Sequence, residues 1–376
     1  MKISSIKKQL PLLFLLLLAV FRVGRYCDGD IKTCLLQEKQ DQPEAPLFLQ
    51  KLNPHFEAIR EQATYIARKY LPSPHSELLL GMVIGIDNFN KIPFFKQALI
   101  DTGTIHVVVV SGYNISLVFS LVWSLLGSFY NKGKLTIGLV ISLLYAGLSG
   151  FQPPVIRAWI MGSIAYLGRH HGTSFPTVRV LLVSVLAMIL WQPAFLFSLS
   201  FQLSFSATAS LILFSDFVKQ KLPFISRIPE LFREDFICTV AAQILVWPLL
   251  SYYFGRVSWI SVLVNMLILW TVPLATVLGG VFLLAALVGE FATQILAFIV
   301  YIPLDTFVFI TKIFSNLNIP QVNFQISSAI MVGYYSVLLL FLLFKARRAK
   351  LASQNNSGVD ITTSNKDFIA SPLTSN

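Results

Sequence analysis

Charged residues are scarce in this sequence. Lysine, arginine, aspartate and glutamate together make up 12% of its 376 residues, whereas soluble domains contain about a quarter. Hydrophobic residues account for 55% of the chain, and the mean hydropathy is +0.69. The shortage of charge excludes an ordinary soluble domain and indicates an integral membrane protein, whose solvent is lipid.

Signatures of catalysis are also missing. The chain contains no GxxxxGK[ST] loop for nucleotide phosphates, no HExxH or HxHxDH metal motif and no GxSxG nucleophile elbow. Ser111 and His106 lie five positions apart, so they do not share a helical face as a nucleophile and its base would need to. We therefore expect no enzyme activity, no cofactor and no metal site.

Cysteine is rare as well, with three residues in the chain. Cys27 and Cys34 lie in a polar stretch with no further cysteine or histidine close by, which argues against a metal site. If that stretch is extracytoplasmic, a disulfide between the two is expected in its oxidising compartment. We predict Cys238 to be a small buried hydrophobic residue.

Long apolar runs, by contrast, recur from residue 10 to residue 344. A helix of about 20 apolar residues crosses the hydrocarbon core, and every spanning backbone group must be hydrogen-bonded internally. We predict an all-α fold, a polytopic transmembrane helical bundle of about ten spans with a small extracytoplasmic N-terminal region. The predicted spans are 104–127, 135–150, 154–169, 178–195, 198–215, 236–254, 257–271, 272–289, 291–314 and 328–344.

The composition divides the chain into four regions. Residues 1–24 have a basic start and a short apolar run, which predict an N-terminal signal anchor. Residues 25–100 are mostly polar and are expected to be extracytoplasmic. Residues 101–344 hold the predicted spans, and residues 345–376 are a Ser-, Thr- and Asn-rich tail, expected to be disordered and cytoplasmic.

The segment HFEAIREQATYIARKYL, within residues 25–100, predicts an amphipathic helix. Such a helix could lie along the membrane surface or pack against the spans. Its predicted apolar face comprises Phe56, Ile59, Ala63, Ile66 and Tyr70.

Basic residues set the predicted topology. The net charge is +11, and cytoplasmic loops of membrane proteins accumulate lysine and arginine. We explain the charge in this way rather than by nucleic-acid binding. With residues 25–100 outside, the basic loops 131–134, 169–179 and 216–235 all fall on the cytoplasmic side.

After residue 254 the same counting fails, because four more crossings would leave the basic KARRAK segment outside. Either one of the segments 257–271 and 272–289 does not fully cross, or the two form a single broken element around Pro273. We favour a non-crossing or re-entrant segment near 257–271. Such irregular backbone is tolerated only when it is buried in protein or lines a wet cavity.

Ionisable residues in or near spans are candidates for function, because inserting each one costs about 2–3 kcal/mol. They are Asp101, His106, Arg157 and Asp305. Arg157 either snorkels to the interface or meets an anionic solute that enters the bundle. For His106 we favour a hydrogen-bonded interface histidine.

Uncharged polar residues occur in three other spans. Gln202 and Ser204 lie in FSLSFQLSFSATAS, Gln243 in AAQILVWP, and Asn265 in VLVNMLILW. Hydroxyl and small residues often hold membrane helices together, so packing is one explanation. Because each amide needs several hydrogen-bond partners, we favour a bundle with a partly wet interior.

Several segments, taken in order, resemble the competence domain of the ComEC family of DNA-uptake membrane proteins. The resemblance covers roughly residues 78–285, and its motifs are specific as an ordered set. They are LLLGMVIGIDNFNKIPFFKQALIDTGTIHVVVVSGYNISLV, PPVIRAWIM, FSLSFQLSFSATASL and AAQILVWPLLSYYFGRVSWISVLVNMLILWTVPLA.

The resemblance implies a multi-pass channel that carries single-stranded DNA across the cytoplasmic (inner) membrane during natural transformation. It implies as partners single-stranded DNA, membrane lipid, a separate cytoplasmic ATPase or helicase, a DNA receptor, and further copies of the chain in a homo-oligomer. The implied channel residues are His106, Ser111, Gly112, Asn114, Arg157, Gln202, Ser204, Gln243, Asn265 and Pro273.

Within SGYN, Gly112 would let another backbone approach closely, while Ser111 and Asn114 would supply polar atoms to the interior. Family members often have SGLH at this place, so a role of that second histidine does not transfer. Long members also carry a metallo-β-lactamase-like nuclease domain. This sequence shows no counterpart, and we expect a separate polypeptide to supply any nuclease.

Three other functions stay open at this point. The chain could be a transporter, or a handler of lipid-linked precursors, from another family; inverted repeats would support this, and none is evident. It could be an intramembrane enzyme if Asp101, His106 and Arg157 converge. It could also be a non-conducting scaffold.

Overall fold

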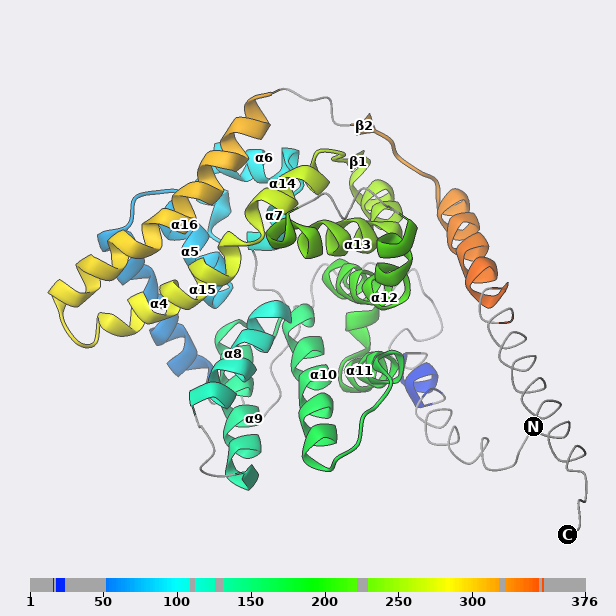
Figure 1. Cartoon of the computed structure of the whole chain (residues 1–376), viewed down its shortest axis with the longest axis horizontal. Helices are drawn as coiled ribbons and strands as arrows, with labels where there is room; N and C mark the ends of the chain where they lie inside the picture. The colour runs from blue at the N-terminus through cyan, green and yellow to red at the C-terminus, as the bar shows by residue number, and fades with distance from the viewer. Residues whose placement is uncertain are drawn as a thin grey trace, which may run out of the picture. The chain divides into compact units, whose positions relative to one another are not determined.

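The computed structural model describes residues 16, 18–23, 52–108, 112–125, 131–221, 229–317, 322–344 and 347. Within these residues the chain is helical apart from two short strands, β1 (Arg256–Val257) and β2 (Val322–Asn323), which pair as a two-stranded sheet (Figure 1). The predicted all-helical fold is confirmed apart from this pair. Both cysteines of the predicted disulfide, Cys27 and Cys34, lie outside the described residues.

The helices from residue 131 onward overlap the predicted segments, and α10 over 153–170 and α16 over 290–316 match them within two residues. The helices over 199–221 and 230–254 each extend six residues further than predicted. A further apolar helix covers Ser328–Phe344. In chain order the labelled helices are α4 (Asn53–Tyr70), α5 (His75–Ile84), η1 (Phe89–Lys91), α6 (Pro93–Asp101), α7 (Ile105–Val108), α8 (Gly112–Leu125), α9 (Asn131–Leu148), α10 (Pro153–His170), α11 (Thr177–Trp191), η2 (Pro193–Phe197), α12 (Leu199–Lys221), α13 (Glu230–Phe254), α14 (Ser261–Ile268), α15 (Thr271–Ala285) and α16 (Glu290–Asn316).

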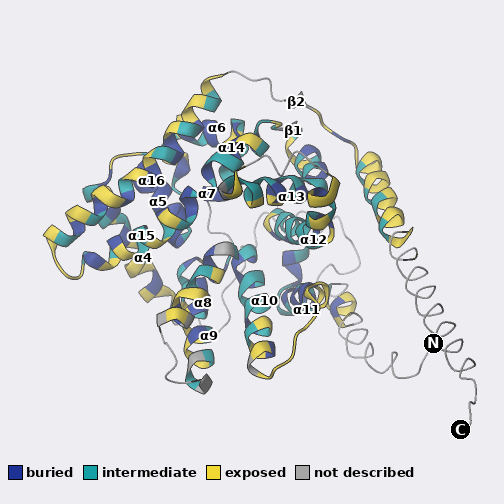
Figure 2. Ribbon diagram, viewed as in Figure 1, coloured by how far each residue is buried: buried dark blue, intermediate teal, exposed yellow. Residues whose placement is uncertain are grey.

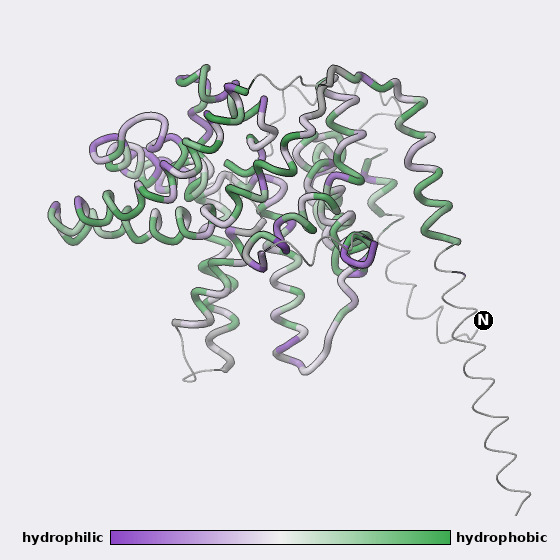
Figure 3. Tube along the Cα trace, turned by 45° about the horizontal axis from the view of Figure 1, so that its top comes forward, coloured by the Kyte–Doolittle hydropathy of each residue, from purple (hydrophilic) through white to green (hydrophobic). Residues whose placement is uncertain are grey.

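Three described helices are long and apolar enough to cross a membrane: Leu199–Lys221, Phe232–Phe254 and Glu290–Asn316. The bent pair of α14 and α15 would make a fourth. Several other apolar helices are shorter than the ~20 residues that a span requires, so the predicted number of about ten spans is not confirmed. Hydrophobic residues, green in Figure 3, occur along the described helices. Exposed residues, yellow in Figure 2, recur along α16, and its large side chains Phe291 and Phe298 are exposed.

The described chain divides into two compact units. The larger comprises residues 1–247 and 257–322, and the smaller comprises 248–256 and 323–376. Within the smaller unit, Phe324 N donates to Gly255 O (3.1 Å), and the Ser251 hydroxyl donates to Phe324 O. Every predicted channel residue that the structure describes belongs to the larger unit.

Two hydrophobic cores hold the larger unit together. One joins α4–α7 to α14–α16 and contains fully buried side chains such as Leu79, Phe282 and Phe307. The other joins α8–α12 and η2 around residues such as Ile115 and Met188. Residues 52–100, which belong to the region predicted to be extracytoplasmic, therefore contribute to a core shared with α14–α16.

Helix α5 is buried along its whole length, and the sequence analysis did not predict it. All ten of its residues are buried. Gly279 of α15 permits the close packing, because a Cβ there would lie 2.5 Å from Leu79 Cδ1 and 2.8 Å from Val83 Cγ2. A helix covered on every side has no polar face, so the periodicity that reveals a surface helix is absent.

The predicted amphipathic helix exists as α4, but its buried face differs from the prediction. Phe56 and Ala63 are buried as expected, and Ala67 joins them, whereas Ile59 is 48% exposed. Ile66 and Tyr70 are half-buried. The small alanines let α4 pack closely against its neighbours α5 and α9. The buried face of α4 is therefore narrower than predicted, and Ile59 lies outside it.

The segment around Pro273 contains a break, which one of the explanations of the topology count predicted. Helices α14 and α15 meet at an angle of 45° after a short interruption, and Pro273 occupies the first turn of α15, where it needs no backbone partner. The geometry is compatible with both sequence-based explanations, a broken span and a re-entrant segment.

The prediction of a buried Cys238 is wrong. Its side chain is exposed on α13, between the buried residues Ile237 and Thr239. In a membrane protein an apolar side chain gains little from facing protein rather than lipid, since lipid tails are equally apolar. Hydrophobicity therefore does not decide which way Cys238 faces.

Candidate functional site

Arg157 occupies the first turns of α10, where α10 packs against α8 and α12. Its Nη1 donates to the Ser204 carbonyl and to the Thr208 hydroxyl, both on α12. The centroid of the Phe205 ring lies 5.9 Å from Arg157 Cζ, the guanidinium carbon. The guanidinium is thus held by neutral groups from the neighbouring helix.

Two features of Arg157 are unusual. Its Nε is buried without a hydrogen-bond partner. Among the described residues, no carboxylate forms an ion pair with the Arg157 guanidinium. The salt bridges between described residues all involve other cations. A cation inside an apolar bundle normally pairs with an anion or lines a wet pathway. Arg157 is therefore the strongest candidate for contact with an anionic solute.

Gly112 begins the described part of α8 directly opposite Arg157. A Cβ at this position would lie 2.7 Å from Arg157 Nη2 and 3.0 Å from Ala158 Cβ. The absence of a side chain at Gly112 makes room for the guanidinium. The structure therefore brings together Gly112, Arg157 and Ser204, three residues that the sequence analysis selected.

Asn114 points to a different place, the C-terminal end of α5. Three side chains from α8, α9 and the start of α10 converge there on carbonyls that helix ends leave without intrahelical partners. The bonds run from Asn114 Nδ2 to Met82 O (2.6 Å), from Tyr145 Oη to Val83 O (2.8 Å) and from Gln152 Nε2 to Gly85 O (3.4 Å). The Oδ1 of Asn114 is buried without a partner.

Gln243 takes part in a separate polar chain. Its Nε2 donates to Ser261 Oγ (2.8 Å), and Ser261 Oγ donates to Ser258 O (2.8 Å). Ser258 Oγ in turn donates to Asp101 O at the end of α6 (2.9 Å). Asn265, on the same short helix as Ser261, is 2% exposed, and its Oδ1 is buried without a partner.

The remaining predicted residues are dispersed. Gln202 Nε2 donates to the carbonyls of Leu196 (3.2 Å) and Phe197 (3.4 Å) and so secures η2 against α12. His106 is exposed on α7, and Ser111 lies outside the described residues. The predicted set is therefore not one constellation; its centre is the group around Arg157.

Asp305 has a partner that the sequence analysis missed. His75 Nε2 lies 3.0 Å from Asp305 Oδ1, and the imidazole stacks on the Tyr301 ring with centroids 4.5 Å apart. His75 is buried at the start of α5, and its Nδ1 has no partner. The interaction joins α5 to α16. His75 was overlooked because its segment was assigned to a polar region outside the bundle.

We expect Asp305→Leu to lower the free energy of unfolding by about 1 kcal/mol, because it leaves the buried His75 ring without its polar partner. The value is modest since the Asp305 side chain is 52% exposed. The measurement is the thermal unfolding midpoint of the detergent-purified protein. The double variant His75→Phe/Asp305→Leu should recover most of the loss; a double variant less stable than Asp305→Leu would contradict this account.

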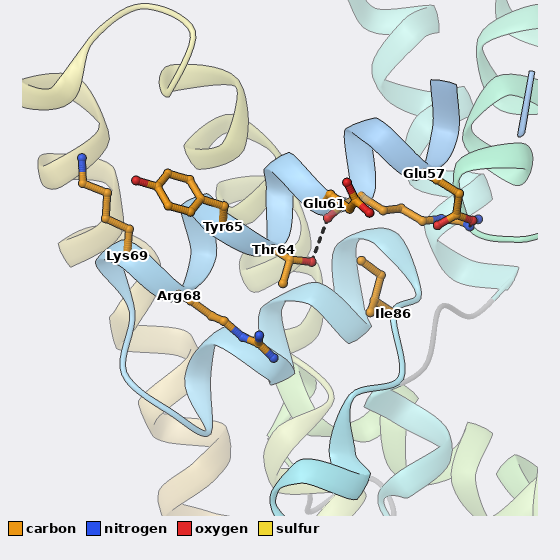
Figure 4. A pocket seen from close by; sticks show the side chains of 8 residues that line it. Glu57, Glu61, Thr64, Tyr65, Arg68, Lys69 and Ile86 are labelled. Atoms are coloured by element: carbon orange, nitrogen blue, oxygen red, sulfur yellow. Dashed lines mark hydrogen bonds and ion pairs between the residues drawn. The ribbon is translucent and has the colours of Figure 1, made fainter. Parts of the chain in front are cut away.

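A groove follows α4 on the surface of the larger unit. One part, of about 700 Å³, is lined by α4 side chains and Ile86, with Tyr65 and Lys69 towards one end and Glu57 towards the other (Figure 4). A second part, of about 610 Å³, shares Glu57, Arg60 and Ile86 with the first. It also reaches the polar side chains of Gln152, Gln192, Ser198 and Ser200.

Ion pairs hold most of the charged groups that line this groove. Arg60 donates to the carbonyls of Leu148 (2.8 Å) and Gly147 (3.1 Å) and pairs with Glu57. Lys69 pairs with Glu290 of α16, and this hydrogen bond raises the pKa of Lys69 above its ordinary value. The lysine thus stays charged. The charges of the groove are thus largely neutralised, in contrast to the charge of Arg157.

The fold and this site define a class: a helical membrane protein with a cation held inside its bundle. The profile of the family described as "Competence: Competence protein" matches residues 92–348. Because this match covers more than half of the sequence, the chain belongs to the competence protein family. The resemblance noted from the sequence motifs is thereby confirmed.

Curated relatives agree with this assignment. The chain is similar to "ComE operon protein 3" of Bacillus subtilis, with 26% identity over 56% of this chain and 26% of that protein. It is also similar to the uncharacterized protein YcaI of Escherichia coli, with 25% identity over 70% of this chain and 36% of the relative. The chain thus spans about a quarter to a third of the length of these relatives. No solved structure matches it.

Proposed function

We propose that the chain is a component of a channel in the cytoplasmic membrane that passes single-stranded DNA inward during natural transformation. Membership of the competence protein family supports a role in competence and DNA uptake. The channel role, the single-stranded substrate and the multi-pass placement in the cytoplasmic membrane go beyond that membership.

The observation that carries the proposal is the guanidinium of Arg157 without a described carboxylate partner. Removing a charge from water costs several kcal/mol unless an opposite charge and hydrogen bonds compensate it. A passing phosphodiester would supply the missing negative charge, and guanidinium groups bind phosphate in a bidentate manner. The contact would be independent of base sequence and weakened by salt.

The groove along α4 supports an opening on the outer face. The segments 149–153 and 192–200 are both predicted on the outer side, and both contribute to the groove. Its amide and hydroxyl groups offer hydrogen bonds, and the exposed Tyr65 offers a ring on which a base can stack. We propose that the strand passes this groove before it meets Arg157.

The conduction is passive, in line with the missing GxxxxGK[ST] loop and other catalytic motifs. A cytoplasmic ATPase or helicase supplies the motive force, a receptor delivers the DNA, and copies of the chain assemble in lipid. The chain needs neither a cofactor nor a metal ion for this task.

The deciding experiment compares uptake of labelled DNA by the native host with and without this chain. We expect the deletion to abolish label in the cytoplasm while surface binding persists, because the strand then has no path through the membrane. Restoring the gene on a plasmid is the control. Unchanged cytoplasmic label, in a host shown to take up DNA, would contradict the channel and favour a non-conducting scaffold.

A further inference from the structure

Thr208 was not among the residues that the sequence motifs selected, yet it contacts the central cation. It lies four positions after Ser204 on α12, so the two residues share one face of the helix. Arg157 Nη1 donates both to the Thr208 hydroxyl and to the Ser204 carbonyl. Together these two acceptors hold one arm of the guanidinium against α12.

The direction of each hydrogen bond follows from which groups can donate and which can only accept. The Thr208 hydroxyl donates its own proton to the Ser204 carbonyl one turn earlier (Oγ1 to O, 3.0 Å). Its oxygen lone pairs therefore remain for Arg157, which can only donate. The carbonyl accepts from both residues, which closes a ring of three polar groups.

Without Thr208 the arginine would be poorly oriented. Its long side chain has many rotamers, and fixing one of them costs conformational entropy that the hydrogen bonds must offset. The absence of a side chain at Gly112 leaves space beside Nη2. Without the Thr208 hydroxyl, Arg157 Nη1 would keep one acceptor on α12, the Ser204 carbonyl, instead of two.

We propose that Thr208 is a positioning residue that orients Arg157 for contact with a phosphate group of the substrate. This inference rests on the proposed function. Thr208 does not touch the strand itself; it holds Nη1. The Nε atom, which is buried without a protein partner, is then the donor left for a phosphate oxygen that enters the bundle.

The test compares Thr208→Val with Thr208→Ser in the labelled-DNA uptake assay. Valine keeps the shape but removes the acceptor, so we expect uptake to fall about tenfold, the equivalent of one charge-assisted hydrogen bond. Serine keeps the hydroxyl and should restore most of the uptake. Thr306→Val is the matched control, because Thr306 Oγ1 donates to the Ile302 carbonyl one turn earlier (2.9 Å) on α16.

Uptake is expressed per molecule of protein in the membrane, measured by quantitative immunoblot, so that a folding defect does not count. In an Arg157→Lys background, Thr208→Val should reduce uptake much less than in the native background, since the fork it orients is gone. An equal reduction in both backgrounds, or unchanged uptake in Thr208→Val while Arg157→Ala is impaired, would overturn the positioning role alone. Uptake that survives deletion of the whole chain would overturn the proposed function instead.

Discussion

Replacing Arg157 with alanine is expected to reduce the uptake of labelled DNA by roughly 10- to 100-fold, the equivalent of losing charge-assisted hydrogen bonds to a phosphate. The guanidinium lies between α8, α10 and α12 without a described carboxylate partner. A strand that enters the bundle would then meet only neutral groups at this point. The measurement is label reaching the cytoplasm, normalised to the amount of protein in the membrane.

Two variants make this result specific. Arg157→Lys keeps the positive charge but loses the planar fork, so it should fall between native protein and Arg157→Ala. Arg169→Ala removes an exposed arginine near the other end of α10 and should leave uptake nearly unchanged. Equal losses in Arg157→Ala and Arg169→Ala would show that general charge, and not this site, governs uptake.

Replacing Gly279 with alanine is expected to lower the free energy of unfolding by about 1–3 kcal/mol, the usual cost of overpacking a core. The new methyl group would lie 2.5 Å from Leu79 Cδ1 and 2.8 Å from Val83 Cγ2. Both side chains belong to the buried helix α5 and cannot turn away into solvent. Separation of α5 from α15 would disturb the core that joins α4–α7 to α14–α16.

The neighbouring glycine provides the control. A Cβ at Gly280 would meet nothing within 4 Å, so Gly280→Ala should be neutral or stabilise the helix by up to about 1 kcal/mol. Thermal unfolding of both variants in the same detergent separates clash from helix propensity. Equal midpoints for Gly279→Ala and Gly280→Ala would contradict the tight packing of α5 on α15.

Local patterns in the sequence were enough to predict most of the helices. Apolar runs placed α10 and α16 within two residues of their observed bounds, because helix formation depends mainly on neighbouring residues. The same runs do not settle the number of spans, since an apolar helix of 10–17 residues serves equally well inside a protein core. Length, rather than hydropathy, separates the two cases.

The sequence by itself determined the class of protein, its family and the prominence of Arg157, because composition, ordered motifs and a charge in an apolar segment are all local properties. Only the tertiary structure decided that Thr208 holds this arginine, that His75 meets Asp305, and that α5 is buried between other helices. These contacts join residues between 51 and 230 positions apart. Helical periodicity repeats over a few residues, so it says nothing about which helices meet or which face of a fully buried helix finds a partner.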